Sequence, residues 1–486
     1  MTARATEAEP LLSAYDPAGY YDELFRRRDD DTPEMARIRQ RLGEIPFEEL
    51  QRRAKDAERE LFNLGITFLI LSESTAVDRI LPFDVVPRVI TAPEWARLEA
   101  GIKQRVATLN LFLHDLYHDQ KILADGVVPR DMIEGHPQFA AAMVGVDVPF
   151  DTYVHILGVD LVRDGEGVFR VLEDNARVPS GVSYVVENRH MMQRAFSDLM
   201  DDIGVRPVDA YGPRLAAALA AVAPKRAGEP QAVVLSPGSY NSAYFEHVFL
   251  AREMGVPLVE GGDLFVDADD RVFMKTVDGP APVDAIYRRL GDDFLDPEVF
   301  RSDSMIGVPG LMRAYRAGHV VLANAVGTGV ADDKAVYAYM PRIVKYYLDQ
   351  DPILPNVPTN ICREREGLAY TLDHLDELVV KPVGEAGGYG ITIGPRATAE
   401  QLEACRKALL ADPANYISQP TIPLSVCPTL TDGSIEPRHV DLRPFAVTGE
   451  STWVLPGGLT RVALRKGSLV VNSSQGGGSK DTWVLE

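Results

Sequence analysis

The sequence predicts a mixed α/β fold made of several parts, and three observations support this prediction. Residues 231–325 alternate short apolar runs with helical segments, which is typical of a small parallel α/β domain. Residues 153–175 and 379–393 each contain two apolar runs around a polar or glycine-rich turn, the pattern of a β-hairpin. Residues 47–62 and 93–120 carry apolar residues at helical spacing.

The N-terminal region is expected to be mostly helical and charged. In the second of its two helical segments, Pro93 suits the first turn, after Thr91 or Ala92. We therefore expect residues 1–90 to form a helical extension, and residues 91–222 to join a helical segment to the first hairpin.

Acidic residues mark this first hairpin. Glu173 and Asn175 are two positions apart on its second strand, so their side chains point the same way. Asp160, on the first strand, can lie across from them. Two carboxylates and one amide oxygen on one face suit Mg²⁺ held together with substrate phosphates. The alternative is a solvated acidic hairpin, since Asp and Glu are usually exposed.

A turn-rich segment, residues 175–184, leaves the hairpin. It places Arg177 and backbone N–H groups beside the predicted metal site, where a carboxylate substrate would find hydrogen-bond donors. A plain connection between a strand and a helix is the alternative.

The α/β domain is assigned to residues 231–329. Its first strand is Ala232–Leu235, its first helix Tyr244–Met254, and a second strand follows at 257–259. The preceding segment, 223–230, is the best linker candidate.

The most informative motif is a lysine followed by a glycine-rich loop. Lys381 ends an apolar run, and a second strand starts at residue 391. Glycine N–H groups can close over phosphate oxygens, and the lysine supplies a positive charge. A Walker loop would open a helix, which this loop does not. A glycine hairpin beside a solvated lysine is the alternative. The loop residues singled out are Gly384, Gly387, Gly388, Tyr389 and Gly390.

Residues 437–447 alternate charged and apolar side chains, as expected for a strand with one charged face. That face is functional if it lines a cleft and carries no meaning if it is exposed. Pro444 indicates an edge or a bulge. Arg461 and Arg465 follow in a second basic, glycine-rich region. The charged face would present His439, Asp441 and Arg443.

Composition excludes several classes of function. The chain has 486 residues and a formal net charge of −21, which disfavours nucleic acid and anionic membranes as partners. Its three cysteines lack CxxC spacing, so reduced thiols in the cytoplasm are expected. We find no signal-peptide pattern and no apolar run long enough to span a bilayer. A homo-oligomer remains open.

Together these motifs resemble the circularly permuted ATP-grasp proteins of type 2, and especially the synthetase half of glutathionylspermidine synthetase. The similarity covers roughly residues 90–486, and the metal hairpin precedes both lysines, as in permuted members. The segment Leu-Glu-x-Asn-Ala-x-x-Pro-Ser reads closely like that synthetase. The matching motifs are Lys334 after two aspartates, Lys381 with its glycine loop, a hinge-like segment at 415–422, Asp441-x-Arg443 and Glu173-x-Asn175.

The resemblance implies a circularly permuted ATP-grasp fold, with residues 231–329 as the pre-ATP-grasp domain and residues 330–486 as nucleotide-binding lobes. It implies ATP and Mg²⁺ as cofactors, with two metal ions expected and Mn²⁺ as an alternative. Nucleotide contacts are implied for Lys334, Lys381, the glycine loop, Gln419, Ile422 and Asp441. Metal contacts are implied for Asp160, Glu173 and Asn175, and stabilisation of the transferred phosphoryl group for Arg443, Arg465 and Arg177.

The sequence departs from the family at two positions. Gln419 stands where many relatives have glutamate, and no acidic residue follows within 420–430 to hold the ribose. Gly158 stands where the synthetase has an arginine, two residues before the metal aspartate.

The implied reaction is an ATP-dependent ligation. A carboxylate attacks the γ-phosphate, and an amine then displaces phosphate from the resulting acyl phosphate. The expected substrates are a small-molecule or peptide carboxylate and an amine, neither of which the sequence names. The alternatives are an ATP-dependent phosphotransferase and a nucleotide-binding interaction protein that has lost catalysis. The complete metal set and both lysines argue against the last.

Overall fold

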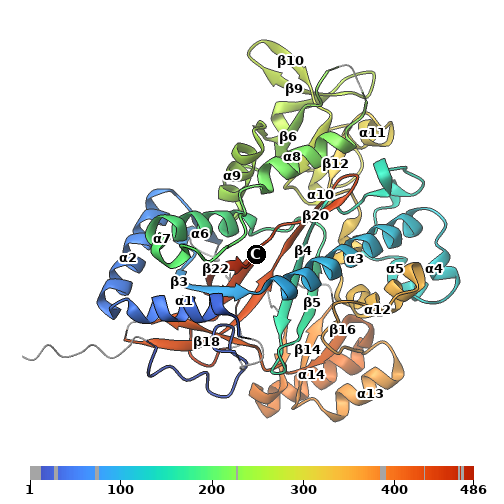
Figure 1. The fold of residues 1–486 in the computed structure, drawn as a ribbon. Helices are drawn as coiled ribbons and strands as arrows, with labels where there is room; N and C mark the ends of the chain where they lie inside the picture. The colour runs from blue at the N-terminus through green and yellow to red at the C-terminus, as the bar shows by residue number, and fades with distance from the viewer. Residues whose placement is uncertain are drawn as a thin grey trace, which may run out of the picture.

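The structure is a computed structural model that describes residues 12–26, 31–71, 76–225, 228–383, 390–431, 433–468, 471 and 476–486. The predicted mixed α/β fold is confirmed (Figure 1). A large mixed sheet forms the centre, a small parallel α/β unit stands at the top of the view, and a smaller antiparallel sheet lies at the bottom.

The central sheet joins strands from distant parts of the chain. Its nine described strands follow the order β20-β19-β4-β18-β21-β22-β3, with β5 paired to β4 and β17 to β18. The pairs are antiparallel except β22 with β3. The bounds are β3 Phe83–Ile90, β4 Ile156–Arg163, β5 Phe169–Asn175, β17 Val426–Leu430, β18 Ile435–Arg443, β19 Phe445–Thr448, β20 Thr452–Val454, β21 Leu459–Val462 and β22 Gly478–Val484.

Both faces of this sheet are covered. Strands β3, β4 and β22 are buried along their whole length, including the charged residues that each of them carries. Helix α3 (Ala92–Tyr117) contacts β19 and β20, and helix α6 (Val182–Ala195) packs against β22. Thr91 caps α3, with Pro93 in its first turn, as predicted.

The expectation of a helical N-terminal region needs correction. Helices α1 (Pro33–Glu44) and α2 (Phe47–Asn63) are present, but the strand pair β1 (Thr67–Leu71) and β2 (Ala76–Ile80) follows, and β3 then joins the central sheet. The cause is tertiary pairing: β3 bonds β22, almost 400 residues away in the chain, which local periodicity does not reveal.

The parallel α/β unit has strand order β12-β11-β6-β7. Its predicted strand, helix and second strand are confirmed as β6 (Ala232–Leu235), α9 (Tyr244–Met254) and β7 (Leu258–Val259). The other bounds are α8 Tyr211–Val222, β11 Ala285–Arg288, α10 Asp292–Leu295, α11 Leu311–Arg316 and β12 Val321–Ala323, with the antiparallel strands β8 Leu264–Val266, β9 Val272–Thr276 and β10 Gly279–Pro282.

The small antiparallel sheet has the order β13-β16-β14-β15. Helices α13 (Arg365–Asp373) and α14 (Ala399–Ala411) form an apolar cluster with it, and α12 (Lys334–Leu348) contacts β13 and β16. The predicted hairpin after Lys381 is confirmed. The strands are β13 Asn360–Ile361, β14 Leu378–Pro382, β15 Thr392–Ile393 and β16 Tyr416–Pro420; the short helices elsewhere are α4 Lys121–Ala124, α5 Arg130–Ile133 and α7 Ser197–Met200.

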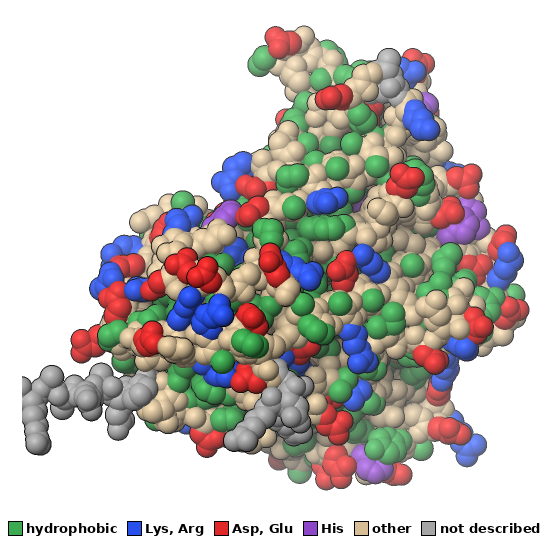
Figure 2. Space-filling model, viewed as in Figure 1, with side chains coloured by type: hydrophobic (Ala, Val, Ile, Leu, Met, Phe, Trp, Pro, Cys, Tyr) green, Lys and Arg blue, Asp and Glu red, His purple; other side chains and the backbone are tan. Residues whose placement is uncertain are grey.

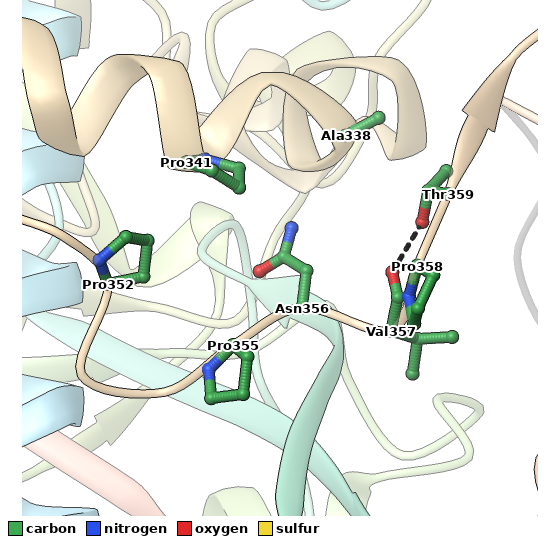
Figure 3. A pocket seen from close by; sticks show the side chains of 8 residues that line it. All are labelled: Ala338, Pro341, Pro352, Pro355, Asn356, Val357, Pro358 and Thr359. Atoms are coloured by element: carbon green, nitrogen blue, oxygen red, sulfur yellow. Dashed lines mark hydrogen bonds between the residues drawn. The ribbon is translucent and has the colours of Figure 1, made fainter.

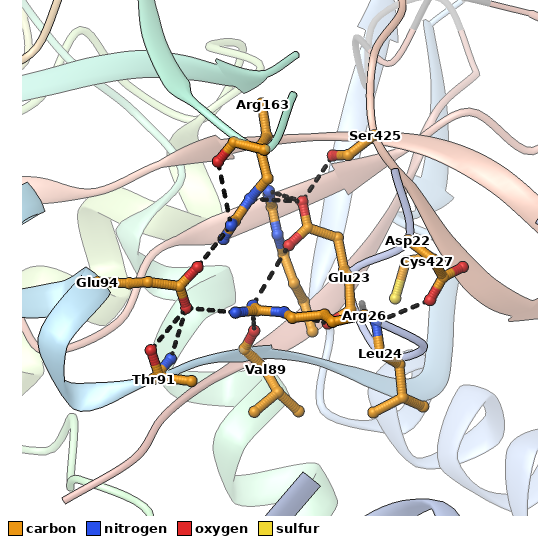
Figure 4. Close-up of polar contacts among 12 residues, drawn as sticks. Asp22, Glu23, Leu24, Arg26, Val89, Thr91, Glu94, Arg163, Ser425 and Cys427 are labelled. Carbon is orange, nitrogen blue, oxygen red and sulfur yellow. Dashed lines mark hydrogen bonds and ion pairs between the residues drawn. The ribbon is translucent and has the colours of Figure 1, made fainter. Parts of the chain in front are cut away.

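The N-terminal segment is fastened by buried charges (Figure 4). Glu23 is fully buried and lies 2.6 Å from Arg88 of β3 and 3.2 Å from Arg163 at the end of β4. Ser425, just before β17, donates a hydrogen bond to the same carboxylate. One glutamate therefore ties the start of the chain to three strands of the central sheet.

The exposed surface carries mixed charges. On the face shown in Figure 2, acidic and basic side chains are interspersed, with no large area of one sign. Among the described residues, no helix is both long and apolar enough to cross a membrane. The three cysteines are buried and not bonded to one another.

Candidate functional site

Asp160 lies at the centre of a buried ionic network. Arg443 of β18 donates hydrogen bonds to its carboxylate from two nitrogens: Nε donates to Oδ1, and Nη2 donates to Oδ2 over 2.8 Å. Arg461 of β21 donates to the same Oδ2 from 2.6 Å. Burial alone would raise the pKa of Asp160, but the two guanidinium groups hold that pKa well below its ordinary value.

Arg461 also joins Asp160 to Asp441. Asp441 and Arg461 are directly paired in the β18–β21 register, and both Asp441 oxygens accept hydrogen bonds from Arg461. Asp441, predicted as a nucleotide contact, is 1% exposed. Burial and the charge of Asp160 raise its pKa, against the opposing effect of Arg461. A nucleotide contact at Asp441 would therefore compete with Arg461.

The hairpin brings the three predicted metal ligands together. Asp160 is paired with Glu173, and Asn175 donates from Nδ2 to Asp160 Oδ1 over 3.3 Å. Glu173 Oε1 lies 3.9 Å from Arg443 Nη2. Burial and the neighbouring Asp160 raise the pKa of Glu173, whereas Arg443 and Lys334 lower it.

The two predicted lysines lie on different elements near Glu173. Lys334 begins α12, directly after Asp333, whose side chain caps the helix. Lys381 of β14 donates to Gln419 Oε1 over 2.6 Å. Burial and the positive charge of Lys334 lower the pKa of Lys381 to about 8, although Glu173 opposes this shift. The lysines and Glu173 therefore share one electrostatic environment.

Gln419 connects this lysine to Thr359, one of the residues that line the cavity shown in Figure 3. Its Nε2 donates to Thr359 over 2.9 Å, and Thr359 lines an open cavity of about 380 Å³ beside α12. The cavity lies next to the Lys381–Gln419 contact, whereas the Asp160 network does not line it. The lining residues are Ala338, Pro341, Pro352, Pro355, Asn356, Val357, Pro358 and Thr359.

Arg177 and Arg465 are placed differently from Arg443. Arg177 Nε lies 3.5 Å from Asp332, which also accepts the backbone N–H groups of Ala176 and Arg177. The loop after β5 is thus tied to the segment just before Lys334. Arg465 is exposed beyond β21 and is not brought to Asp160. Arg461, four positions earlier, is the residue of this region that contacts Asp160.

The remaining predicted contacts lie at the hairpin and the hinge. Gly390 has φ +71°, and a Cβ there would lie 3.0 Å from Pro382, so the turn favours glycine. Ile422 is partly exposed just after β16. Gly384, Gly387, Gly388 and Tyr389 lie outside the described residues.

Arg443 also occupies the space above Gly158. A Cβ at Gly158 would lie 3.3 Å from Arg443 Cδ. A side chain at Gly158 would therefore require Arg443 or Pro179 to shift by a few tenths of an ångström.

The donor set fits a magnesium ion in part. Glu173 and Asn175 present oxygens on one face, and Glu173 is partly exposed. Both Asp160 oxygens accept from arginines, so an ion bound there would have to displace one guanidinium. No group of three or more His, Cys, Asp or Glu side chains in the described part of the chain is arranged to hold a metal ion.

Two features of the site were missed from sequence. Arg461 becomes visible only through the β18–β21 register, although the alternation in 459–462 would have placed it on the charged face. The second feature is a buried pair at the loop after the hairpin. Glu246 of α9 accepts the N–H groups of Gly181 and Ser183, and Arg289 donates to it over 2.9 Å.

A family comparison identifies the class of protein that this fold and site define. Residues 87–463 match the family model described as circularly permuted ATP-grasp type 2. The chain belongs to this family, which confirms the resemblance and the predicted fold. ATP and Mg²⁺ are the general cofactors of ATP-grasp ligases.

Individual relatives are similar over most of the chain. The uncharacterized protein sll0335 of Synechocystis is 52% identical over 98% of this chain and 99% of its own length. The uncharacterized protein Rv2411c of Mycobacterium tuberculosis is 50% identical over 99% of this chain and 87% of its own. A Frankia alni protein whose name designates a glutamate–cysteine ligase is 44% identical, but this chain spans 54% of it.

A solved structure supports the fold. A glutathione synthetase-like effector, GSS30, from Globodera pallida matches with a TM-score of 0.57 over 91% of this chain and 98% of its own. Its identity is 11%, so the likeness concerns the fold alone.

Proposed function

We propose that the protein is an ADP-forming carboxylate–amine ligase of the glutathionylspermidine synthetase type, working through an acyl phosphate. The observation that carries the proposal is convergence. Four charged residues from separate elements come together: Glu173 on β5, Lys334 on α12, Lys381 on β14 and Arg443 on β18. Their charges shift the pKa values of Glu173 and Lys381. Phosphoryl transfer to a carboxylate needs such a set, because its catalysis is mainly positioning and charge neutralisation.

The lysines would bind the phosphates of ATP. Lys381 is pre-oriented by Gln419, and Lys334 is the first residue of α12. Glu173 and Asn175 would hold Mg²⁺, which when bound neutralises charge on the β- and γ-phosphate oxygens.

Arg443 pairs with Asp160 and neutralises its charge. A second role follows for this arginine in the proposed reaction. With nucleotide bound, its guanidinium would turn to the transferred phosphoryl group, leaving Asp160 to Arg461 and the metal. Arg461 thus remains as the constant partner of both aspartates.

The acid substrate would bind along the loop that leaves β5. The N-terminus of α6 is already filled by the carboxylate of Glu246, so a substrate carboxylate has to bind upstream, beside Arg177. The amine then attacks the acyl carbon, loses a proton, and phosphate leaves with one oxygen of the original carboxylate.

The activity in the name of the Frankia protein is not assigned to this chain, because this chain matches about half of that protein.

We also propose the four-part division at 1–90, 91–222, 231–329 and 330–486. Three free buried cysteines support a reducing compartment, the cytoplasm.

A screen of acids and amines for ADP release tests the proposal, with products read by mass. We expect ADP release that needs Mg²⁺, one acid and one amine, and a product mass equal to acid plus amine minus water. A phosphorylated product would indicate a phosphotransferase instead, and a complete absence of Mg²⁺-dependent ATP binding would reject catalysis.

A further inference from the structure

We propose that Asn324 is a positioning residue that sets the geometry of the metal-binding hairpin. This inference rests on the proposed function, because it assigns Asn324 a role toward the magnesium site of Glu173 and Asn175. Asn324 directly follows β12, belongs to the parallel α/β unit, and is 1% exposed. It touches none of the predicted ligands directly.

The carboxamide of Asn324 bridges the start of β4 and the segment that follows β5. Its Oδ1 accepts the backbone N–H groups of His155 and Ile156, each over 2.7 Å. Its Nδ2 donates to the carbonyls of Ile156 and Ala176, again over 2.7 Å each. One side chain therefore satisfies four backbone groups, two of them on the residue that begins β4, and its Nδ2 also makes a longer contact of 3.4 Å with the Arg177 carbonyl.

These contacts take the place of one further pair of backbone hydrogen bonds between β4 and the chain after β5. The last residue pair between β4 and β5 at this end is Gly158 with Asn175. One residue further on, Ala176 no longer pairs with β4, and the amide group of Asn324 bridges the gap. A carboxamide has the shape and the bonding groups of a peptide unit, so it can extend a sheet where the backbone diverges.

The hydrogen bonds from Asn324 to Ile156 and Ala176 affect the metal ligands through the backbone that connects these residues to Asp160 and Asn175. Ala176 is covalently joined to Asn175, and Ile156 lies on the strand that carries Asp160. Asp332 accepts the Ala176 N–H, so both backbone polar groups of Ala176, the residue after Asn175, are held by side chains. Asn324 thereby sets the separation of the two ligand-bearing strands.

Asn324 is itself held rigidly. Fully buried Arg288 of β11 donates to the Asn324 carbonyl over 2.6 Å and to the Ala325 carbonyl over 2.8 Å. Arg288 is paired with Asp292 at 2.6 Å. The Asn324 side chain thus couples the carboxyl edge of the parallel sheet to the metal hairpin, beside the hydrogen bond from the Ala325 N–H to the Tyr153 carbonyl.

Asn110 of α3 offers a matched control. Its Oδ1 accepts the N–H groups of Tyr153 and Val154, each over 2.8 Å, on the same segment that leads into β4. Asn110 does not contact Ala176. Asn110→Ala and Asn324→Ser therefore both remove the carboxamide that accepts N–H groups of this segment. Only Asn324→Ser also removes the hydrogen bond to the Ala176 carbonyl, next to the ligand Asn175.

The experiment is calorimetry of ATP binding to the full-length variants, with and without Mg²⁺. For Asn324→Ser we expect a lower melting temperature and a loss of Mg²⁺ affinity of about 10-fold, the usual cost of removing a group that orients a metal ligand. Mg²⁺-free ATP affinity should stay unchanged. Asn110→Ala should lower the melting temperature and leave both affinities unchanged. Equal Mg²⁺ affinities in the two variants would overturn the inference.

Hydrogen exchange in the wild-type protein gives an answer even if Asn324→Ser does not fold. Mg²⁺ with ATP should slow exchange at the amides of His155 and Ile156, which bind Asn324, more than at those of Tyr153 and Val154, which bind Asn110. Equal slowing at both pairs would overturn the inference. Wild-type protein that binds ATP without any effect of Mg²⁺ would instead overturn the proposed function.

Discussion

At the scale of single residues, the candidate site is a balance of charges. Asp160 is predicted from sequence as a metal ligand because of its place across from Glu173 and Asn175, and the structure brings these three together. The arginines that surround it could not all be predicted, because Arg461 reaches Asp160 through a strand pairing that depends on tertiary structure.

The lysines are tested by removal. Lys381→Ala and Lys334→Ala should each weaken ATP binding by about 1.5–3 kcal/mol, the contribution of a hydrogen bond to a charged group. Calorimetry measures this, and Lys466→Ala, an exposed lysine beyond β21, serves as the control. An unchanged ATP affinity in folded Lys381→Ala would show that the glycine hairpin is only structural.

The pKa of Lys381 predicts a pH dependence. Burial lowers this pKa to about 8, so above pH 8 the free protein has lost the charge that binds phosphate. ATP affinity should therefore fall as pH rises from 7 to 9.5, with proton uptake on binding. Lys381→Arg stays charged and should show a smaller fall. Equal pH dependence in both proteins would contradict the assigned role.

Glu173 and Asn175 are tested as metal ligands. Glu173→Gln keeps the shape but removes a charge, so Mg²⁺-dependent turnover should collapse while the fold remains. Asn175→Asp keeps an oxygen and adds a charge, so it should be milder. ADP release across a Mg²⁺ titration measures both. Wild-type activity of Glu173→Gln at limiting Mg²⁺ would reject the metal site.

At the scale of elements, the hairpins and the α/β unit could be predicted, whereas β3 and the N-terminal segment could not. Periodicity and turn residues identify β4, β5 and β14, because their signals are local. The assembly of β4 with β18 depends on contacts such as Leu161 with Leu442, which no local pattern encodes. Pro444 marks a break between β18 and β19, but inside the sheet, since both strands pair with β4.

The buried charge of Glu23 in the N-terminal segment is expected to contribute to the free energy of unfolding. Glu23→Gln removes one charge from a fully buried cluster, leaves Arg88 without its carboxylate partner and leaves Arg163 paired with Glu94 alone, so unfolding free energy should drop by about 3–5 kcal/mol. Glu49→Gln breaks pairs with Arg52 and Arg53 at the surface and should have a much smaller effect. Urea unfolding compares them. Equal effects would show that the segment is not fastened by Glu23.

At the scale of the whole molecule, the fold brings distant segments into one site. Arg443 and Asp160 are 283 positions apart in the chain yet share a two-nitrogen ion pair. The permuted order of motifs was readable from sequence because each motif has its own local pattern. Their convergence needed the structure, because it depends on how the central sheet meets the small antiparallel sheet (Figure 1).

The most direct test of the proposed ligase mechanism follows an oxygen atom of the acid substrate. An acid identified in the screen is labelled with ¹⁸O in its carboxylate and incubated with the protein, ATP, Mg²⁺ and the amine. An acyl phosphate predicts that one ¹⁸O per turnover appears in inorganic phosphate, together with ADP and the amide. Phosphate without ¹⁸O, or AMP in place of ADP, would contradict the proposed ligase mechanism.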